Sequence, residues 1–284
     1  MVRALCFARM SLFLLGGEDH RTHVTPYGAP LGAGLPWWTP AQNATYPLAE
    51  CALVDLNDDT AAGGRNHSSG GFNGTFSAEL YGARLLQMLD QHDTNKPLFV
   101  YTAWHVAHLP LEVPMRYKQR YHGVIADRDR LVYAAMISAV DDQLGLIIAK
   151  LKARGMYNNT VIVLTTDNGG PICVNMSNAT ARDEGCSRNC GSNNYPLRGS
   201  KMTDFSGGTR GVALVSSPLL PTDRRGVRWS GMSHGTDLYV TLARLAGVPD
   251  AALAASGPLS PDGVDLWPAL VSDAPSPRTE LVVR

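Results

Sequence analysis

Apolar residues recur every three to four positions in three stretches of the chain, a spacing that places them on one face of an α-helix. The pattern predicts helices from Phe76 to Leu89, from about Arg128 to Arg154, and from Thr236 or Asp237 through Ala246. Gly155 directly follows the second stretch, and glycine is the residue that commonly ends a helix. We therefore expect three helices, each burying one apolar face.

Three shorter apolar runs have the length and composition of β-strands: Leu98–Trp104, Thr160–Thr166 and Gly211–Ser217. The run Thr160–Thr166 is nearly continuous and rich in β-branched residues, which is typical of a strand covered on both faces in a parallel sheet. Strand and helix patterns alternate along the chain. This alternation favours an α/β layer fold with a mostly parallel sheet.

Two segments lack such periodicity. Residues 24–74 are rich in Gly, Pro, Asn and Ala, and we expect an irregular loop segment there. Residues 172–192 contain three of the five cysteines together with many Asn and Ser residues, and we expect a loop insertion. In an oxidising compartment this loop could hold a local disulfide, either Cys186–Cys190 or Cys173–Cys186.

Polar side chains follow or precede the predicted strands. His105 and His108 follow Leu98–Trp104, Asp167 and Asn168 follow Thr160–Thr166, and Lys201 precedes Gly211–Ser217. The carboxyl ends of parallel strands meet at one edge of a sheet, so these residues can converge. Carboxylate and carboxamide oxygens suit Ca²⁺ or Mg²⁺. The alternative is that "DNGG" is simply a good turn sequence.

A divalent cation, an imidazole and an ammonium group at one edge suit an ester of a tetrahedral oxyanion. The cation and the lysine would stabilise negative charge, and the histidine would manage a proton. For His105 a structural role is the simpler interpretation. A zinc site made by the H-x-x-H pair is disfavoured, because its intervening residues belong to a Pro-rich loop and not to a helix face.

The overall charge narrows the class of partner. The 284 residues carry a formal net charge of zero and no basic run, which argues against binding to nucleic acid or to an anionic membrane.

No apolar run is long enough for a transmembrane segment, and the opening residues make a poor signal peptide. N-glycosylation sequons nevertheless favour the secretory pathway, either extracellular or lysosome-like. They lie at Asn43, Asn66, Asn73, Asn158, Asn175 and Asn178.

Four segments in one order resemble the sulfatases, and most closely the arylsulfatase B group, which cleaves N-acetylgalactosamine 4-sulfate. They are "KPLFVYTAWHVAHLPLEVP", "YAAMISAVDDQLGLIIAKLKARGMYNNTVIVLTTDNGGP", "NNYPLRGSKMTDFSGGTRGVALVSSPLL" and "MSHGTDLYVTLARLAGV". The resemblance runs from about Ser11 to the C-terminus and weakens in residues 24–74 and 172–192. It implies an alkaline-phosphatase-like α/β/α sandwich with a mostly parallel sheet, of which residues 1–284 are the central part, incomplete at both ends.

Individual roles follow from the same resemblance. Asp167 and Asn168 are similar to two of the family's ligands for Ca²⁺ or Mg²⁺. His108 resembles the active-site histidine, which contacts the sulfate ester and is placed to protonate the leaving oxygen. Lys201 resembles the lysine that binds the sulfate group. The implied substrate is a sulfate ester of a small molecule or, more specifically, of a glycan.

Two departures from the family pattern limit these expectations. Sulfatases carry a C-x-P/A-x-R motif whose cysteine becomes formylglycine, the nucleophile, and this sequence contains no such motif. The family's N-terminal pair of metal-binding aspartates also has no match. We therefore expect a truncated sulfatase that binds a sulfate ester without efficient turnover. The alternatives are a non-catalytic sulfatase-like protein that binds sulfated glycans, and a phosphodiesterase of the same superfamily, which the sparse Asp/His set disfavours.

Overall fold

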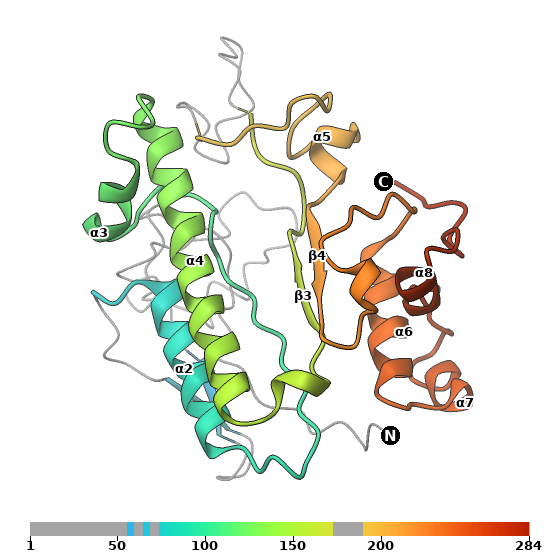
Figure 1. The fold of residues 1–284 in the computed structure, drawn as a ribbon. Helices are drawn as coiled ribbons and strands as arrows, with labels where there is room; N and C mark the ends of the chain where they lie inside the picture. The colour runs from blue at the N-terminus through green and yellow to red at the C-terminus, as the bar shows by residue number, and fades with distance from the viewer. Residues whose placement is uncertain (1–55, 60–64, 69–73, 173–189, 284) are drawn as a thin grey trace, which may run out of the picture.

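The structure is a computed structural model that describes residues 56–59, 65–68, 74–172 and 190–283. In it, helices cover both sides of a central pair of strands (Figure 1). The long helices are α2 (Ser77–Gln91), α4 (Arg128–Ala153) and α6 (Gly235–Leu245), and the central strands are β3 (Ile162–Thr165) and β4 (Ala213–Ser216). The other elements are β1 (Leu56–Asp59), β2 (Arg65–Ser68), α3 (Met115–Lys118), α5 (Ser206–Thr209), α7 (Asp250–Ala254) and α8 (Trp267–Ser272).

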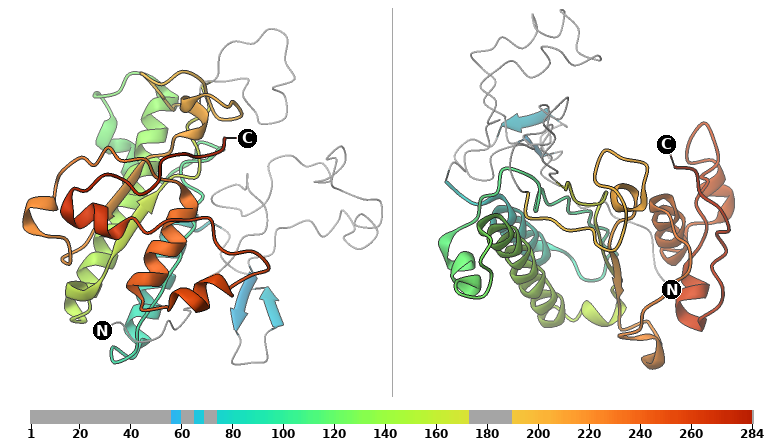
Figure 2. Two further views of the ribbon diagram at one scale, coloured as in Figure 1. Left: turned by 90° about the vertical axis from the view of Figure 1, so that its right-hand side faces the viewer. Right: turned by 90° about the horizontal axis from the view of Figure 1, so that it is seen from above.

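The three predicted helices form as α2, α4 and α6. The pair α2 and α4 lies on one side of β3 and β4, whereas α6, α7 and α8 lie on the other, as the further views also show (Figure 2). Asp127 begins α4 by accepting a hydrogen bond from the Arg130 N–H at 2.7 Å. Gly155 ends it with a φ of 70°, the left-handed conformation that glycine adopts without strain.

Helix α4 supplies the centre of one hydrophobic core. Its Ala135, Met136 and Ala139 are fully buried, and they share a cluster with Phe76 and Tyr117. By length and composition alone α4 could cross a membrane, and it is the single such helix in the described part of the chain. Its buried face against α2 accounts for part of this apolar composition, because burial in a core selects the same residues, whereas Ile137 and Leu146 are exposed.

The strands β3 and β4 pair antiparallel, with Ile162 opposite Ser216 and Thr165 opposite Ala213. Both strands were predicted, but as members of a mostly parallel sheet that would also include Leu98–Trp104. That segment is not a regular strand. A regular strand makes a continuous ladder of hydrogen bonds with a neighbouring strand, and within the described structure this segment makes only an isolated bridge at Phe99. Leu98, Val100 and Ile162 instead all pack against the buried cluster of Leu85, Leu89, Ile147 and Leu151.

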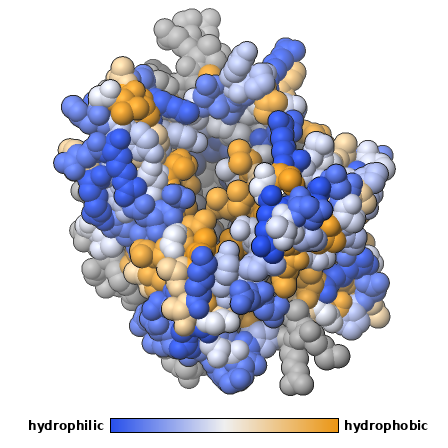
Figure 3. Space-filling view, viewed as in Figure 1, coloured by the Kyte–Doolittle hydropathy of each residue, from blue (hydrophilic) through white to orange (hydrophobic). Residues whose placement is uncertain are grey.

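The expectation that β3 is covered on both faces is wrong for its second half. The side chain of Leu164 is 39% exposed, and that of Leu214 on β4 is 51% exposed. Within the described residues this sheet is only two strands wide, so its faces are not fully covered. Hydrophobic residues accordingly gather in a hollow in the middle of the molecular face drawn in Figure 3.

Part of the segment 24–74, predicted as irregular, contains regular structure. The strands β1 and β2 lie in it and pair antiparallel, with Leu56 opposite Ser68 and Asp59 opposite Arg65. Polar four-residue strands of this composition give little periodic signal, which is why the sequence pattern did not reveal them.

The second side of the molecule is organised around the buried carboxylate of Asp237 in the first turn of α6. Asp237 is fully buried and accepts from the guanidinium of Arg278 at 2.6 and 2.8 Å. Its oxygens also accept the backbone N–H groups of Val264, at 2.9 Å, and His234, at 2.7 Å. This carboxylate therefore fastens the C-terminal segment and the 262–266 loop to the start of α6.

Burial acts to raise the pKa of Asp237, but the hydrogen bonds from Arg278, Val264 and His234 outweigh it, so the pKa lies below its usual value. Asp237→Asn should lower the free energy of unfolding by about 3 kcal/mol at pH 7, because it leaves the Arg278 charge buried without its partner. Urea unfolding measures this difference. The exposed pair Arg244–Asp250 supplies the control, since Asp250→Asn should cost less than about 1 kcal/mol.

The same substitution has a pH signature. A depressed pKa in the folded state contributes stability above the unfolded-state pKa of about 3.9, and this contribution is lost as the pH falls through the folded-state value. The stability difference between the wild type and Asp237→Asn should therefore shrink below about pH 4. A difference that stayed constant from pH 7 down to acid unfolding would contradict the role given to this carboxylate.

Candidate active site

Two of the predicted site residues meet directly. Lys201 lies in the loop before β4 and His108 in the loop after Leu98–Trp104, 93 positions apart, yet Lys201 Nζ is 3.2 Å from His108 Nε2. His108 is exposed and Lys201 is half-buried. An ammonium group and an imidazole thus face each other at the accessible surface, where both can reach a bound anion.

The contacts of the His108 ring define its tautomer. Nδ1 lies 2.9 Å from the carbonyl oxygen of Leu109, and a carbonyl can only accept, so Nδ1 carries the hydrogen in this contact. Nε2 of the neutral ring is then the acceptor that faces the Lys201 ammonium group. The backbone supports this placement, because the His108 N–H donates to the His105 carbonyl at 2.8 Å.

His105 has the structural surroundings expected for it. Its ring packs edge-on against the ring of the buried Tyr81, with centroids 5.8 Å apart and an interplanar angle of 86°. Within the described ranges no three His, Cys, Asp or Glu side chains come together as a metal-binding group.

Asp167 and Asn168 follow β3 and shape a turn. Asp167 Oδ1 accepts the Asn168 N–H at 2.8 Å, and Asn168 Nδ2 donates to the Gly169 carbonyl at 2.8 Å. These bonds engage one carboxylate oxygen and the amide nitrogen, so the second carboxylate oxygen and the amide oxygen remain to bind a cation. Hard oxygens suit Ca²⁺ or Mg²⁺, which need more ligands than these two. Asp167 and Asn168 can therefore form a turn and still offer oxygen ligands to a cation.

The turn is joined to the loops that precede β4 by backbone contacts. The Gly169 N–H donates to the Gly208 carbonyl at 2.8 Å, and the Lys201 N–H donates to the Gly170 carbonyl at 3.1 Å. A Cβ at position 169 would lie 1.8 Å from the Gly207 carbonyl oxygen, a distance that no side chain can occupy. Gly169 is therefore required for the close approach of α5 to the Asp167–Asn168 turn. The loop that precedes α5 and carries Lys201, called the lysine loop below, lies beside the same turn.

Asn194 is a residue of this site that the sequence did not single out. Its side chain bonds to both backbone groups of Gly170 and to the Gly199 carbonyl. The only sequence signal was its place in "NNYPLRGSK", the segment that carries Lys201.

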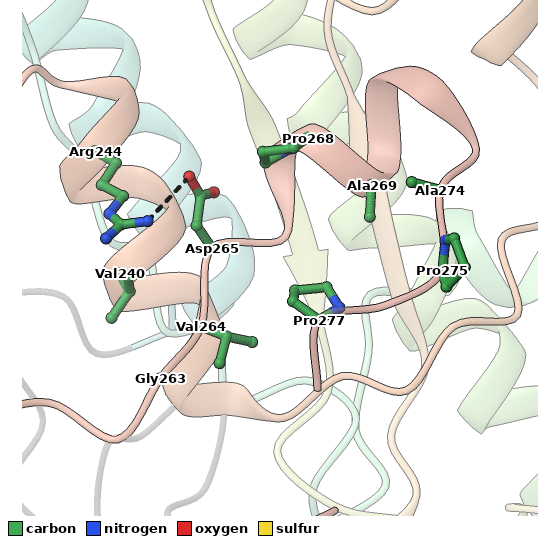
Figure 4. Close-up of a pocket in the computed structure, with 10 residues that line it drawn as sticks. All are labelled: Val240, Arg244, Gly263, Val264, Asp265, Pro268, Ala269, Ala274, Pro275 and Pro277. Carbon is green, nitrogen blue, oxygen red and sulfur yellow. Dashed lines mark ion pairs between the residues drawn. The ribbon is translucent and has the colours of Figure 1, made fainter. Parts of the chain in front are cut away.

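A separate hollow of about 430 Å³ lies between α6 and the 263–277 segment (Figure 4). Its lining is mainly apolar and includes Pro268, Pro275 and Pro277, and it contains none of the four predicted site residues. The lining's two charged side chains, Arg244 and Asp265, approach each other to 3.7 Å. The single carboxylate of the lining is therefore the one that faces Arg244.

The predicted modifications fall mostly outside the described residues. Cys190 is buried and disulfide-bonded, and its partner lies outside the described ranges. Cys173 and Cys186, the two cysteines predicted to share this loop, also lie outside those ranges. Asn158 lies in a short 3₁₀ helix, Tyr157–Asn159, and is exposed. Asn66 falls in β2. The remaining sequon asparagines lie outside the described residues: Asn43, Asn73, Asn175 and Asn178.

Comparison with known proteins places this arrangement in a family. The sequence model of the family described as "Sulfatase" matches residues 32–248, well over half of the chain. The chain belongs to the sulfatase family. It is 36% identical over 211 residues to arylsulfatase J of Mus musculus, covering 74% of this chain and 31% of that protein. It is 29% identical over 198 residues to arylsulfatase A of Homo sapiens, covering 68% of this chain and 32% of that protein.

The fold agrees with this membership. The PsFucS1 sulfatase from Pseudoalteromonas sp. superposes with a TM-score of 0.60 at 25% identity, over 76% of this chain and 39% of that one. The sulfatase fold is the alkaline-phosphatase-like α/β/α sandwich, and the chain is a part of it. The chain spans about a third of the length of the curated relatives it matches. These comparisons do not distinguish the arylsulfatase B group from other sulfatases.

The close approach at Gly169 gives a stability test. Gly169→Ala should lower the free energy of unfolding by about 1–3 kcal/mol, because the added methyl forces the turn away from the Gly207 carbonyl. Gly145→Ala is the matched control, since a Cβ there, in the interior of α4, meets nothing within 4 Å. It should raise stability by about 0.5–1 kcal/mol. Equal effects of the two substitutions in urea unfolding would contradict the close contact.

Proposed function

We propose that this chain carries the sulfate-binding and metal-binding part of a metal-dependent sulfuric ester hydrolase of arylsulfatase type, acting on a carbohydrate sulfate in the secretory pathway. The observation that carries the proposal is the contact of Lys201 Nζ with His108 Nε2 at 3.2 Å, in a loop bonded to the Asp167–Asn168 turn. Charge and chemistry in this arrangement match what a sulfate monoester needs.

Lys201 and His108 would each act on a different oxygen of the sulfate ester. The Lys201 ammonium group donates hydrogen bonds to a non-bridging sulfate oxygen and stabilises its charge. As Lys201 turns to the anion, His108 Nε2 is released from its present contact. Nε2, an acceptor in that contact, then takes up a proton from solvent, and the imidazolium so formed donates it to the bridging oxygen of the leaving alcohol.

The cation's binding residues are Asp167 and Asn168. A bound Ca²⁺ or Mg²⁺ would neutralise negative charge on the sulfate oxygens. The described residues offer one carboxylate and one amide oxygen for it, which fits a hard cation and leaves most of the coordination shell to other ligands.

Turnover needs a nucleophile, and the 284 residues contain no C-x-P/A-x-R motif. We therefore infer that this chain on its own binds sulfate esters and does not hydrolyse them efficiently. The same observation supports a second candidate function, a sulfatase-like protein that holds sulfated glycans without cleaving them. The two functions share the anion site and differ only in catalysis.

Binding of inorganic sulfate and of a chromogenic aryl sulfate tests the anion site. Lys201→Ala should weaken both affinities by about ten- to a hundredfold, the value of a charge-assisted hydrogen bond. Lys96→Ala is the control, because Lys96 is exposed and pairs only loosely with Asp93 at 4.0 Å. Titration calorimetry gives both affinities, and absorbance reports turnover. Equal affinity in the wild type and Lys201→Ala would disprove the site, and turnover that His108→Ala abolishes would disprove the binding-only inference.

Metal affinity is the second test. With one carboxylate and one amide oxygen, the site should bind Ca²⁺ no more tightly than about 10⁻⁴ to 10⁻³ M, the range of weak extracellular sites. Asp167→Asn should abolish this binding, whereas Asp141→Asn, on the exposed face of α4, should leave it unchanged. Micromolar Ca²⁺ affinity in calorimetry would show that further carboxylates complete the shell.

A further inference from the structure

The side chain of Asn194 links the turn after β3 to the loop that carries Lys201. Its Oδ1 accepts the Gly170 N–H at 2.9 Å, and its Nδ2 donates to the Gly170 carbonyl at 2.7 Å. Nδ2 also lies 3.2 Å from the Gly199 carbonyl, two residues before Lys201. One carboxamide thus engages both backbone groups of a residue 24 positions away, which resembles one rung of a β-ladder.

The bonds around this link all join the same two segments. The Lys201 N–H donates to the Gly170 carbonyl at 3.1 Å, and the Ile172 N–H donates to Ser200 Oγ at 3.2 Å. Ser192 Oγ donates to the Pro171 carbonyl. Asn194 is half-buried at the centre of this set and provides three of its contacts.

The loop is anchored at its other end too. The Gly191 carbonyl accepts from Arg130 Nη1, at the start of α4, at 2.7 Å. Between this anchor and Lys201 the chain contains the exposed residues Asn193 and Tyr195, which make only a local turn: the Tyr195 N–H donates to Asn193 Oδ1 at 2.9 Å. The Asn194 bridge therefore supplies three of the bonds that set the position of Lys201 relative to Asp167 and Asn168.

We propose that Asn194 is a positioning residue that holds Lys201 beside the Asp167–Asn168 turn, so that the ammonium group and the cation act on one sulfate group. This role rests on the proposed function of Lys201. It requires both halves of the carboxamide, the acceptor for the Gly170 N–H and the donor for the Gly170 and Gly199 carbonyls. Aspartate at this position keeps the acceptor and places a negative charge against two carbonyl oxygens.

Hydrogen exchange of the full chain, followed by NMR, tests the bridge itself. In Asn194→Ala the Gly170 amide should exchange at least about tenfold faster, because it loses the acceptor that Asn194 Oδ1 provides. In both Asn194→Ala and Asn194→Asp the Lys201 amide should also exchange at least about tenfold faster, because the Nδ2 donor bonds that hold its loop against the Gly170 carbonyl are lost. The ladder amides of β3 and β4 should be unchanged. Asn193→Ala is the matched control, since Asn193 makes only its local turn. Unchanged exchange at Lys201 in both Asn194 variants would overturn the proposal.

Sulfate binding tests whether the bridge positions Lys201. Both Asn194 variants should bind inorganic sulfate about tenfold more weakly, whereas Asn193→Ala should bind as the wild type does. Only variants whose far-ultraviolet circular dichroism and β3–β4 exchange match the wild type are compared. Faster exchange with wild-type sulfate affinity would overturn the positioning role, while loss of affinity in Lys201→Ala would still support the proposed function. Wild-type sulfate affinity in Lys201→Ala would instead overturn the proposed function and the positioning role, even where exchange confirms the bridge.

Discussion

The close packing of backbone against backbone at Gly169 is the constraint on which the site depends. The turn after β3 and the glycine pair Gly207–Gly208 approach so closely that a single methyl group at position 169 would overlap a carbonyl oxygen. The backbone hydrogen bond from Gly169 to Gly208 does not by itself require glycine; the overlap of an added methyl group with the Gly207 carbonyl does. The absence of a side chain is what allows the lysine loop to lie directly beside the Asp167–Asn168 turn.

From this approach the arrangement of charge follows. The loop held against the turn carries Lys201, whose ammonium group reaches His108 Nε2 across the site. The carbonyl of Leu109 keeps the hydrogen of the neutral imidazole on Nδ1, so the ring presents an acceptor toward the lysine. In the proposed function, a sulfate group that enters between them competes with Nε2 for the same ammonium hydrogens.

The two sides of the sandwich are stabilised differently. Helices α2 and α4 share an apolar core in which small and flexible side chains such as Ala135 and Met136 are fully buried. The side formed by α6 and the C-terminal segment depends instead on a buried ion pair, Asp237 with Arg278, satisfied by two backbone N–H groups. Apolar packing tolerates changes of pH, whereas a buried carboxylate makes that side sensitive to acid.

The sequence by itself determined the three long helices α2, α4 and α6, the strands β3 and β4, and the family, because local periodicity and short motifs encode them. It also selected His108, Asp167, Asn168 and Lys201. Only the tertiary structure decided that β4 runs antiparallel to β3, that Leu98–Trp104 lacks a regular ladder, and that Leu164 is exposed. The contacts of Asn194 with Gly170 and the meeting of Lys201 with His108 were also decided there. Contacts between residues 24 or 93 positions apart depend on how intervening chain reverses direction, and no local pattern encodes that geometry.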